Sequence, residues 1–180
     1  MGEKEPEARR EFVLTEPFFW GDFSKSGTCL LEENLRIYFP EYELMRDTEV
    51  IVRSDSDTND WLTRLKTGKI KAMLRYWKNT ILVPPPAEIP FGKAKTIIPF
   101  KCVNDSVYLV TGSVTVDQIA IQTIDMITDE DIFLLGLGYR NKQELGFSLW
   151  SDYGEIWPNE IITLYNITDF KINSEDNGAA

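Results

Sequence analysis

Nine lysine and arginine residues lie within forty residues of this chain, between Leu62 and Lys101, alongside a single acid, Glu88. These nine positive charges and one negative charge give the stretch a net charge of +8, whereas the whole chain, with 19 bases and 29 acids, has a net charge of −10. A cationic stretch in an acidic protein favours one defined site for a phosphate or carboxylate over general coating of nucleic acid. We expect the binding chemistry of the chain to lie in this stretch.

Within the stretch, charged and aromatic side chains gather around Gly68 and Arg75. The Arg75 guanidinium has the fork of donors that binds a phosphate or carboxylate in a bidentate way. Trp77 and its neighbour Tyr76 offer rings on which a base can stack. Each also has a structural explanation that stays open: an ion pair for Arg75, core packing for the rings and a helix C-cap for Gly68. The residues of the stretch that we predict to bind a ligand are Lys66, Gly68, Lys69, Lys71, Arg75, Tyr76, Trp77, Lys93 and Lys95.

The composition excludes several other kinds of chemistry. The chain has no histidine, which removes serine and cysteine nucleophiles activated by histidine, histidine-bound zinc and an imidazole general base. Its two cysteines, Cys29 and Cys102, stand far apart, so we expect neither a disulfide framework nor a metal site, and no cofactor. The apolar runs are far shorter than a bilayer span and the N-terminus lacks an apolar signal segment, which predicts a cytoplasmic protein without a membrane segment.

The elements that must position these residues follow from the periodicity of apolar side chains and from capping residues. Strands are expected at 12–19, 35–39, 49–53, 70–77, 95–103, 107–116, 118–125 and 161–170. A helix at 61–66 would end at Gly68, a second would follow the capping box that begins at Thr128, and a third would run from a cap at Asn141 to Trp150. This order predicts an α+β fold that is mainly β.

The same order resembles the ASCH domain, a branch of the PUA-like superfamily. The family has a short helix that ends in Gly and is followed by a strand with the pattern Gly-x-Lys-x-x-Glu-x-Arg. Gly68 and Arg75 stand at the two ends of that pattern, and Trp77 fits the aromatic residue that often follows it. The family's acidic helix start, Gly-aromatic segment and second helix are similar to residues 128–131, 136–139 and 143–145.

The resemblance implies the fold and the domain organisation. It implies a PUA-like β-barrel with short flanking helices at 49–172, preceded by an N-terminal extension, partly strand, at 1–48 and followed by a polar tail at 173–180. It also places Arg140, in the turn between the last two expected helices, near the mouth of the barrel cleft as a further contact.

Two departures from the family pattern bear on catalysis. The family's Lys position is Ile70 here, and its Glu or Thr position is Met73. Members that act on acetylated cytidine need that Lys and that hydroxyl for nucleophilic or acid–base work, which neither side chain can perform. The resemblance therefore implies a non-enzymatic domain with a basic cleft, whose partner is RNA or a nucleotide-like ligand. Two alternatives stay open: a nucleoside amidohydrolase or nuclease with relocated catalytic groups, and a module that docks a protein partner through its acidic surface and residues 1–48.

Overall fold

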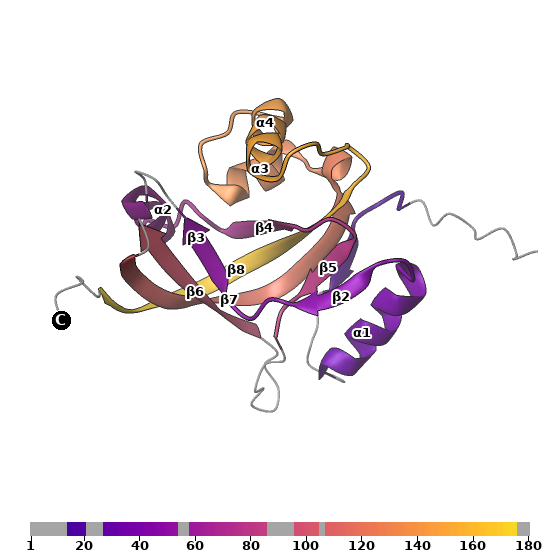
Figure 1. Cartoon of the computed structure of the whole chain (residues 1–180), viewed down its shortest axis with the longest axis horizontal. Coiled ribbons are helices and arrows are strands. Elements are labelled where there is room, and N and C mark those ends of the chain that lie inside the picture. Colours follow the sequence, from indigo (N-terminus) through magenta and orange to yellow (C-terminus); the bar gives the residue numbers. More distant parts are fainter. Residues whose placement is uncertain (1–13, 21–26, 54–57, 86–95, 105–106, 176–180) are drawn as a thin grey trace, which may run out of the picture.

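The centre of the structure is a curled β-sheet with short helices around it (Figure 1). The computed structural model describes residues 14–20, 27–53, 58–85, 96–104 and 107–175. The predicted α+β class, mainly β, is confirmed. In the part of the chain described, no helix is both long and apolar enough to cross a membrane.

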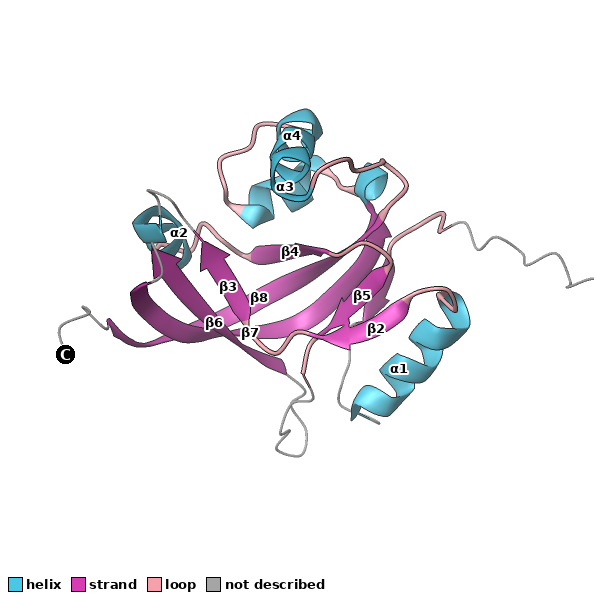
Figure 2. Cartoon of the chain, viewed as in Figure 1, coloured by secondary structure: helices cyan, strands magenta, loops and turns pink. Residues whose placement is uncertain are grey.

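Figure 2 distinguishes the helices, strands and loops by colour. The strands are β1 (Phe18–Trp20), β2 (Glu43–Arg46), β3 (Val50–Arg53), β4 (Ala72–Tyr76), β5 (Thr80–Val83), β6 (Thr96–Asn104), β7 (Val107–Thr123) and β8 (Ile161–Glu175). The helices are α1 (Gly27–Tyr38), α2 (Thr58–Lys66), the 3₁₀ turn η1 (Ile124–Met126), α3 (Asp129–Leu135) and α4 (Lys142–Tyr153).

The larger sheet is organised around β7. One edge of β7 pairs with β6 and then with β1, and its other edge pairs with β8. The strand order is β3-β6-β7-β8-β4, so β3 and β4 are the two edge strands of this sheet. A second sheet consists of β2 and β5, which pair in parallel. The sheet is therefore curled but not closed between β3 and β4.

The two strands predicted at 107–116 and 118–125 are in fact one continuous strand, β7. The apparent break is a bulge, because the pairing of β7 with β8 shifts its register at Asp117. The Asp117 carboxylate accepts a hydrogen bond of 2.8 Å from Nδ2 of Asn166 on β8. This polar residue, which suggested a turn, is therefore bonded to the neighbouring strand. An extra residue of this kind bends the strand and increases its twist, which helps the sheet to curl.

The strand predicted at 35–39 is wrong, because residues 35–38 form the end of helix α1 and Phe39 directly follows it, with its N–H bonded to the Leu35 carbonyl oxygen. Leu35 and Phe39 are four residues apart, a spacing that puts both side chains on one face of a helix. Both are buried in the core, with 0% and 4% of their surface exposed. The described part of the 1–48 segment thus packs into the same core as the larger sheet, and it also supplies β1 and β2.

Two apolar clusters lie on the two sides of β4 and β8. The inner cluster joins residues of α1 and α2 to the sheet. The outer cluster joins residues of α3 and α4 to β4 and β8, and these two helices lie over β4 in Figure 1. Alternate residues of β8 serve both, because Ile161 and Tyr165 belong to the inner cluster whereas Ile162 and Leu164 belong to the outer one. Successive side chains of a strand point to opposite faces, so both faces of this part of the sheet are buried.

Local signals that rest on capping residues are confirmed. Helix α2 ends at Lys66, and Gly68 follows it with φ of +75°. The side chain of Thr128 and that of Asp131 form the predicted capping box, and the side chain of Asn141 caps α4. The strands predicted at 49–53, 70–77, 95–103 and 161–170 also form, with modest shifts of their ends.

Candidate functional site

A pocket of about 290 Å³ opens where the curled sheet does not close. It lies between the edge strands β3 and β4, with α2 and α4 contributing to its walls. An edge strand presents unpaired backbone N–H and C=O groups, so a ligand in this gap meets hydrogen-bonding groups from the main chain. We call it the Arg75 pocket, and it is lined by residues 50–52, 61, 70, 72–75, 135, 137, 139, 145, 148, 149, 152 and 153.

Strand β4 places Arg75 in this pocket. Ala72, Leu74 and Tyr76 pack in the outer cluster under α3 and α4, whereas Met73 belongs to the inner cluster. Arg75 follows Met73 by two residues and therefore shares its face of the strand. The alternation of residue types predicted this division within β4. It also placed Ile70 with Ala72, Leu74 and Tyr76, which is wrong, because Ile70 precedes the strand and belongs to the inner cluster.

The Arg75 guanidinium lies beside a buried carboxylate. Its Nη2 is 3.3 Å from Oδ1 of Asp47, whose side chain is only 4% exposed, whereas 24% of the Arg75 side chain remains exposed. The Tyr165 hydroxyl is 2.8 Å from Oδ2 of Asp47 and 2.7 Å from the Leu82 carbonyl oxygen. One hydroxyl proton is shared between these two acceptors, so the charge of Asp47 is compensated mainly by Arg75.

Two buried tyrosine hydroxyls close to Arg75 and Asp47 stay protonated. Burial raises the pKa of Tyr165 well above its ordinary value, and the Asp47 carboxylate raises it further, while Arg75 opposes the shift. Burial and the 2.7 Å hydrogen bond to Glu160 also raise the pKa of Tyr76. Both hydroxyls therefore stay protonated at neutral pH and cannot act as general bases.

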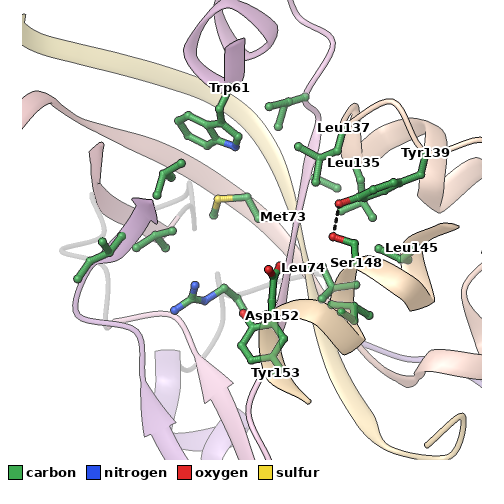
Figure 3. Close-up of a pocket in the computed structure, with 17 residues that line it drawn as sticks. Trp61, Met73, Leu74, Leu135, Leu137, Tyr139, Leu145, Ser148, Asp152 and Tyr153 are labelled. Atoms are coloured by element: carbon green, nitrogen blue, oxygen red, sulfur yellow. Dashed lines mark hydrogen bonds between the residues drawn. The ribbon is translucent and has the colours of Figure 1, made fainter. Parts of the chain in front are cut away.

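Aromatic and polar side chains complete the wall of the Arg75 pocket (Figure 3). Trp61 comes from α2, and its ring packs edge-on against a core aromatic ring with centroids 5.2 Å apart. Tyr139, in the loop before α4, donates a hydrogen bond of 2.6 Å to Oγ of Ser148. Asp152 and Tyr153 come from the last turn of α4. Rings, a guanidinium and a carboxylate in one pocket suit a flat ligand that carries both donors and acceptors.

A second hollow, of about 400 Å³, adjoins the first at Tyr139, which lines both. We call it the Lys69–Lys71 groove, and it is lined by Arg64, Gly68, Lys69, Lys71, Ile132, Phe133, Gly136, Gly138 and Tyr139. Lys69 and Lys71 are exposed, and neither forms an ion pair within the described residues. Their ammonium groups are therefore open to an anionic ligand.

The structure brings four of the predicted binding residues into these two hollows. Arg75 lines the first, and the second is lined by Gly68, Lys69 and Lys71. Lys93 and Lys95 lie outside the described residues. The positive stretch therefore divides between a pocket with one half-buried guanidinium and a groove with two exposed ammonium groups.

Four other predicted residues line neither hollow. Tyr76 is buried in the outer cluster, and Trp77, just after β4, is 53% exposed. Lys66 is exposed at the end of α2. Arg140 is 87% exposed and forms an i,i+4 ion pair of 3.3 Å with Glu144. The aromatic residues that line the pocket are therefore Trp61, Tyr139 and Tyr153 and not the predicted pair.

Residues that sequence reasoning did not select include Asp47, Trp61, Tyr139 and Ser148. Asp47 precedes Arg75 by 28 residues, and nothing local in the sequence links the two. Trp61 could have been selected from the sequence, because it is an aromatic residue on a short predicted helix, and that helix packs on the sheet. Tyr139 lies in the 136–139 segment on which the family resemblance partly rests.

Other reactive groups are few in the part of the chain described. No group of three or more acidic or cysteine side chains there is arranged to hold a metal ion. Cys102 is buried in the inner cluster, and burial raises the pKa of its thiol to about 11. Since only the thiolate is an effective nucleophile, this cysteine is inert at neutral pH.

Comparison with known proteins gives a distant likeness in fold. No protein-family model and no curated protein matches the sequence. The crystal structure of protein EF3133 from Enterococcus faecalis V583, of the DUF984 family, is similar with a TM-score of 0.42 and 11% sequence identity, over 79% of this chain and 87% of that chain. So low a TM-score carries no argument about function.

Proposed function

We propose that this chain is a non-enzymatic domain that binds RNA or a nucleotide-like ligand in the Arg75 pocket. The observation that carries the proposal is the Arg75 guanidinium, which Asp47 holds on one side and which lines the pocket on the other. A guanidinium that is already fixed loses little freedom on binding, and its planar donors match a phosphate or a base edge. Trp61 and Tyr139 supply rings on which a base can stack.

The size and polarity of the pocket support a single nucleoside as its occupant. Its volume of about 290 Å³ is just below the range of roughly 300–1,000 Å³ that is usual for small-molecule sites, which favours a small occupant. Arg75 offers donors and Asp152 offers an acceptor, a combination that reads bases with both kinds of group on one edge. The net charge of −10 disfavours non-specific binding of nucleic acid and directs an anionic ligand to the positive stretch.

The same pocket supports the resemblance to the ASCH domain, which we include in the proposal. The positions that correspond to the Lys, Glu and Arg of the family pattern are Ile70, Met73 and Arg75, and all three line the pocket. Ile70 and Met73 are 3% and 7% exposed, so apolar side chains occupy the places where the family carries chemistry. Binding without catalysis follows from this substitution.

The test is a titration of fluorescein-labelled single-stranded RNA followed by fluorescence anisotropy over a series of salt concentrations. For the Lys69→Ala/Lys71→Ala variant we expect a salt slope of log K that is smaller by about 1.4, since each phosphate contact contributes about 0.7 for a single strand. Lys78→Ala/Lys171→Ala is the matched control, because both lysines are exposed and line neither hollow. The control should bind like the wild type.

A second variant tests the pocket itself. Arg75→Lys keeps a positive charge near Asp47 but removes the planar fork, so we expect at least tenfold weaker binding with an unchanged salt slope. The proposed function would be refuted if the wild type bound RNA weakly and independently of salt, and if neither variant changed that binding.

A further inference from the structure

We propose that the ligand is a single RNA strand of at least two nucleotides, with one base in the Arg75 pocket and the neighbouring nucleotide in the Lys69–Lys71 groove. This inference rests on the proposed function and narrows its ligand from RNA or a nucleotide-like molecule to a strand that occupies both hollows. It follows from how the two hollows adjoin, from what separates them and from the chemistry of the groove.

The two hollows lie back to back across a wall made of two chain segments. Along 69–72, Lys69 and Lys71 line the groove, whereas the residues between and after them, Ile70 and Ala72, line the pocket. The segment 135–139 alternates in the same way. Leu135 and Leu137 line the pocket, Gly136 and Gly138 line the groove, and Tyr139 lines both. One wall therefore serves both hollows.

Close contacts hold this wall in place. The Lys71 backbone N–H donates to the Leu134 carbonyl oxygen at 2.7 Å, and the Arg64 Nη1 donates to the Gly136 carbonyl oxygen at 3.0 Å. Gly136 has φ of +63°, and a Cβ at that position would overlap the Lys69 carbonyl. The pocket and the groove thus keep a fixed separation before any ligand arrives, which lowers the entropy cost of binding at both.

The groove has the chemistry of a nucleotide subsite. Phe133 on α3 is 77% exposed although it is a large apolar residue, and the buried Ile132 lies beside it in the lining. Lys69 and Lys71 bring two ammonium groups to the same groove. An exposed ring beside free cations matches the combination of base stacking and phosphate neutralisation by which proteins bind single strands.

Gly138 is an exposed residue of the wall between the two hollows. This residue has φ of +85° and no side chain, and a Cβ there would lie 3.6 Å from the Arg64 guanidinium. The sugar–phosphate backbone of a strand that occupies both hollows would cross the wall here, next to a positive charge. Since the neighbouring Tyr139 lines both hollows, the crossing point is also where they meet.

The experiment compares two classes of probe on the full chain. The probes are the four nucleoside 5′-monophosphates, measured by competition, and fluorescein-labelled RNA hexamers of random and of homopolymeric sequence. The test variant is Phe133→Ala. The matched control is Phe147→Ala, because Phe147 on α4 is 69% exposed and lines neither hollow.

We expect the wild type to bind the best hexamer at least about tenfold more tightly than the best monophosphate, because a second stacked base contributes that much. Phe133→Ala should weaken hexamer binding by about tenfold and change monophosphate binding less than twofold, while Phe147→Ala changes neither. Two results would overturn this inference and leave the proposed function standing. In the first, the protein binds monophosphates and Phe133→Ala leaves hexamer binding unchanged. In the second, Phe133→Ala weakens the binding of both probes equally. Absence of binding by every probe would overturn both.

Discussion

The ion pair between Arg75 and Asp47 predicts a measurable loss of stability when Arg75 is replaced by methionine. Methionine keeps an unbranched apolar side chain of similar reach but removes the positive charge. The Asp47 carboxylate, 4% exposed, would then keep only the shared proton of the Tyr165 hydroxyl. Burial of a charge without its partner is among the few causes of large destabilisation by a single substitution.

The expected magnitude follows from the geometry. Loss of one partner of a fully buried pair costs about 3–5 kcal/mol, whereas an exposed pair contributes about 0–1 kcal/mol. Arg75 is 24% exposed and its nitrogen lies 3.3 Å from the carboxylate, so we place this pair between the two cases. We expect Arg75→Met to lower the free energy of unfolding by about 2–3 kcal/mol, which lowers Tm by about 4–12 °C for a chain of this size.

Thermal and urea unfolding of four proteins would measure this effect: the wild type, Arg75→Met, Arg75→Met/Asp47→Asn, and Arg140→Met as a control. The double variant removes the stranded charge and should recover at least about 1 kcal/mol. The control breaks the exposed pair with Glu144 and should cost about 0.3–0.5 kcal/mol. An Arg75→Met protein that unfolds within 1 °C of the control would contradict our account of the network.

Two further predictions concern the wall and the inner core. Gly136→Ala should lower the free energy of unfolding in urea by about 3 kcal/mol or more, because its Cβ would overlap the Lys69 carbonyl in addition to the roughly 1–2 kcal/mol cost of a positive φ. Gly68→Ala is the control, since its Cβ meets open space and it should cost only about 1–2 kcal/mol. Equal losses for the two variants would contradict the close approach of Gly136 to Lys69. In a Cys29→Ser background, the Cys102 thiol should react slowly with a disulfide reagent at pH 8 in the folded protein and rapidly in urea. Burial raises its pKa to about 11, so little thiolate is present at pH 8 in the folded protein. Rapid labelling of the folded protein would refute the buried position of Cys102.

Elements defined by local signals could be predicted from the sequence. The caps at Thr128 and Asn141 depend on side chains that bond to the backbone within three residues, and both form as predicted. The end of α1 was predicted as a strand, because a short apolar run does not reveal that Leu35 and Phe39 have a helical spacing. Strand β7 was predicted as two strands divided at Asp117, because a bulge and a turn both place a polar residue between apolar ones.

The candidate site was predicted in part for the same reason. The positive stretch and the position of Arg75 on one face of its strand are properties of neighbouring residues, so the amino-acid sequence determined them. The partner of Arg75 was decided by the fold, because Asp47 lies at the end of β2 and is brought to Arg75 by the pairing of β2 with β5. The Tyr165 hydroxyl reaches the same carboxylate because β8 pairs with β4. Tertiary packing likewise decided that Trp61, and not the predicted Trp77, lines the pocket. Whether an aromatic residue lines a hollow depends on the elements that face it. Periodicity sets the face of an element on which a side chain lies, and only the assembled structure sets what that face meets.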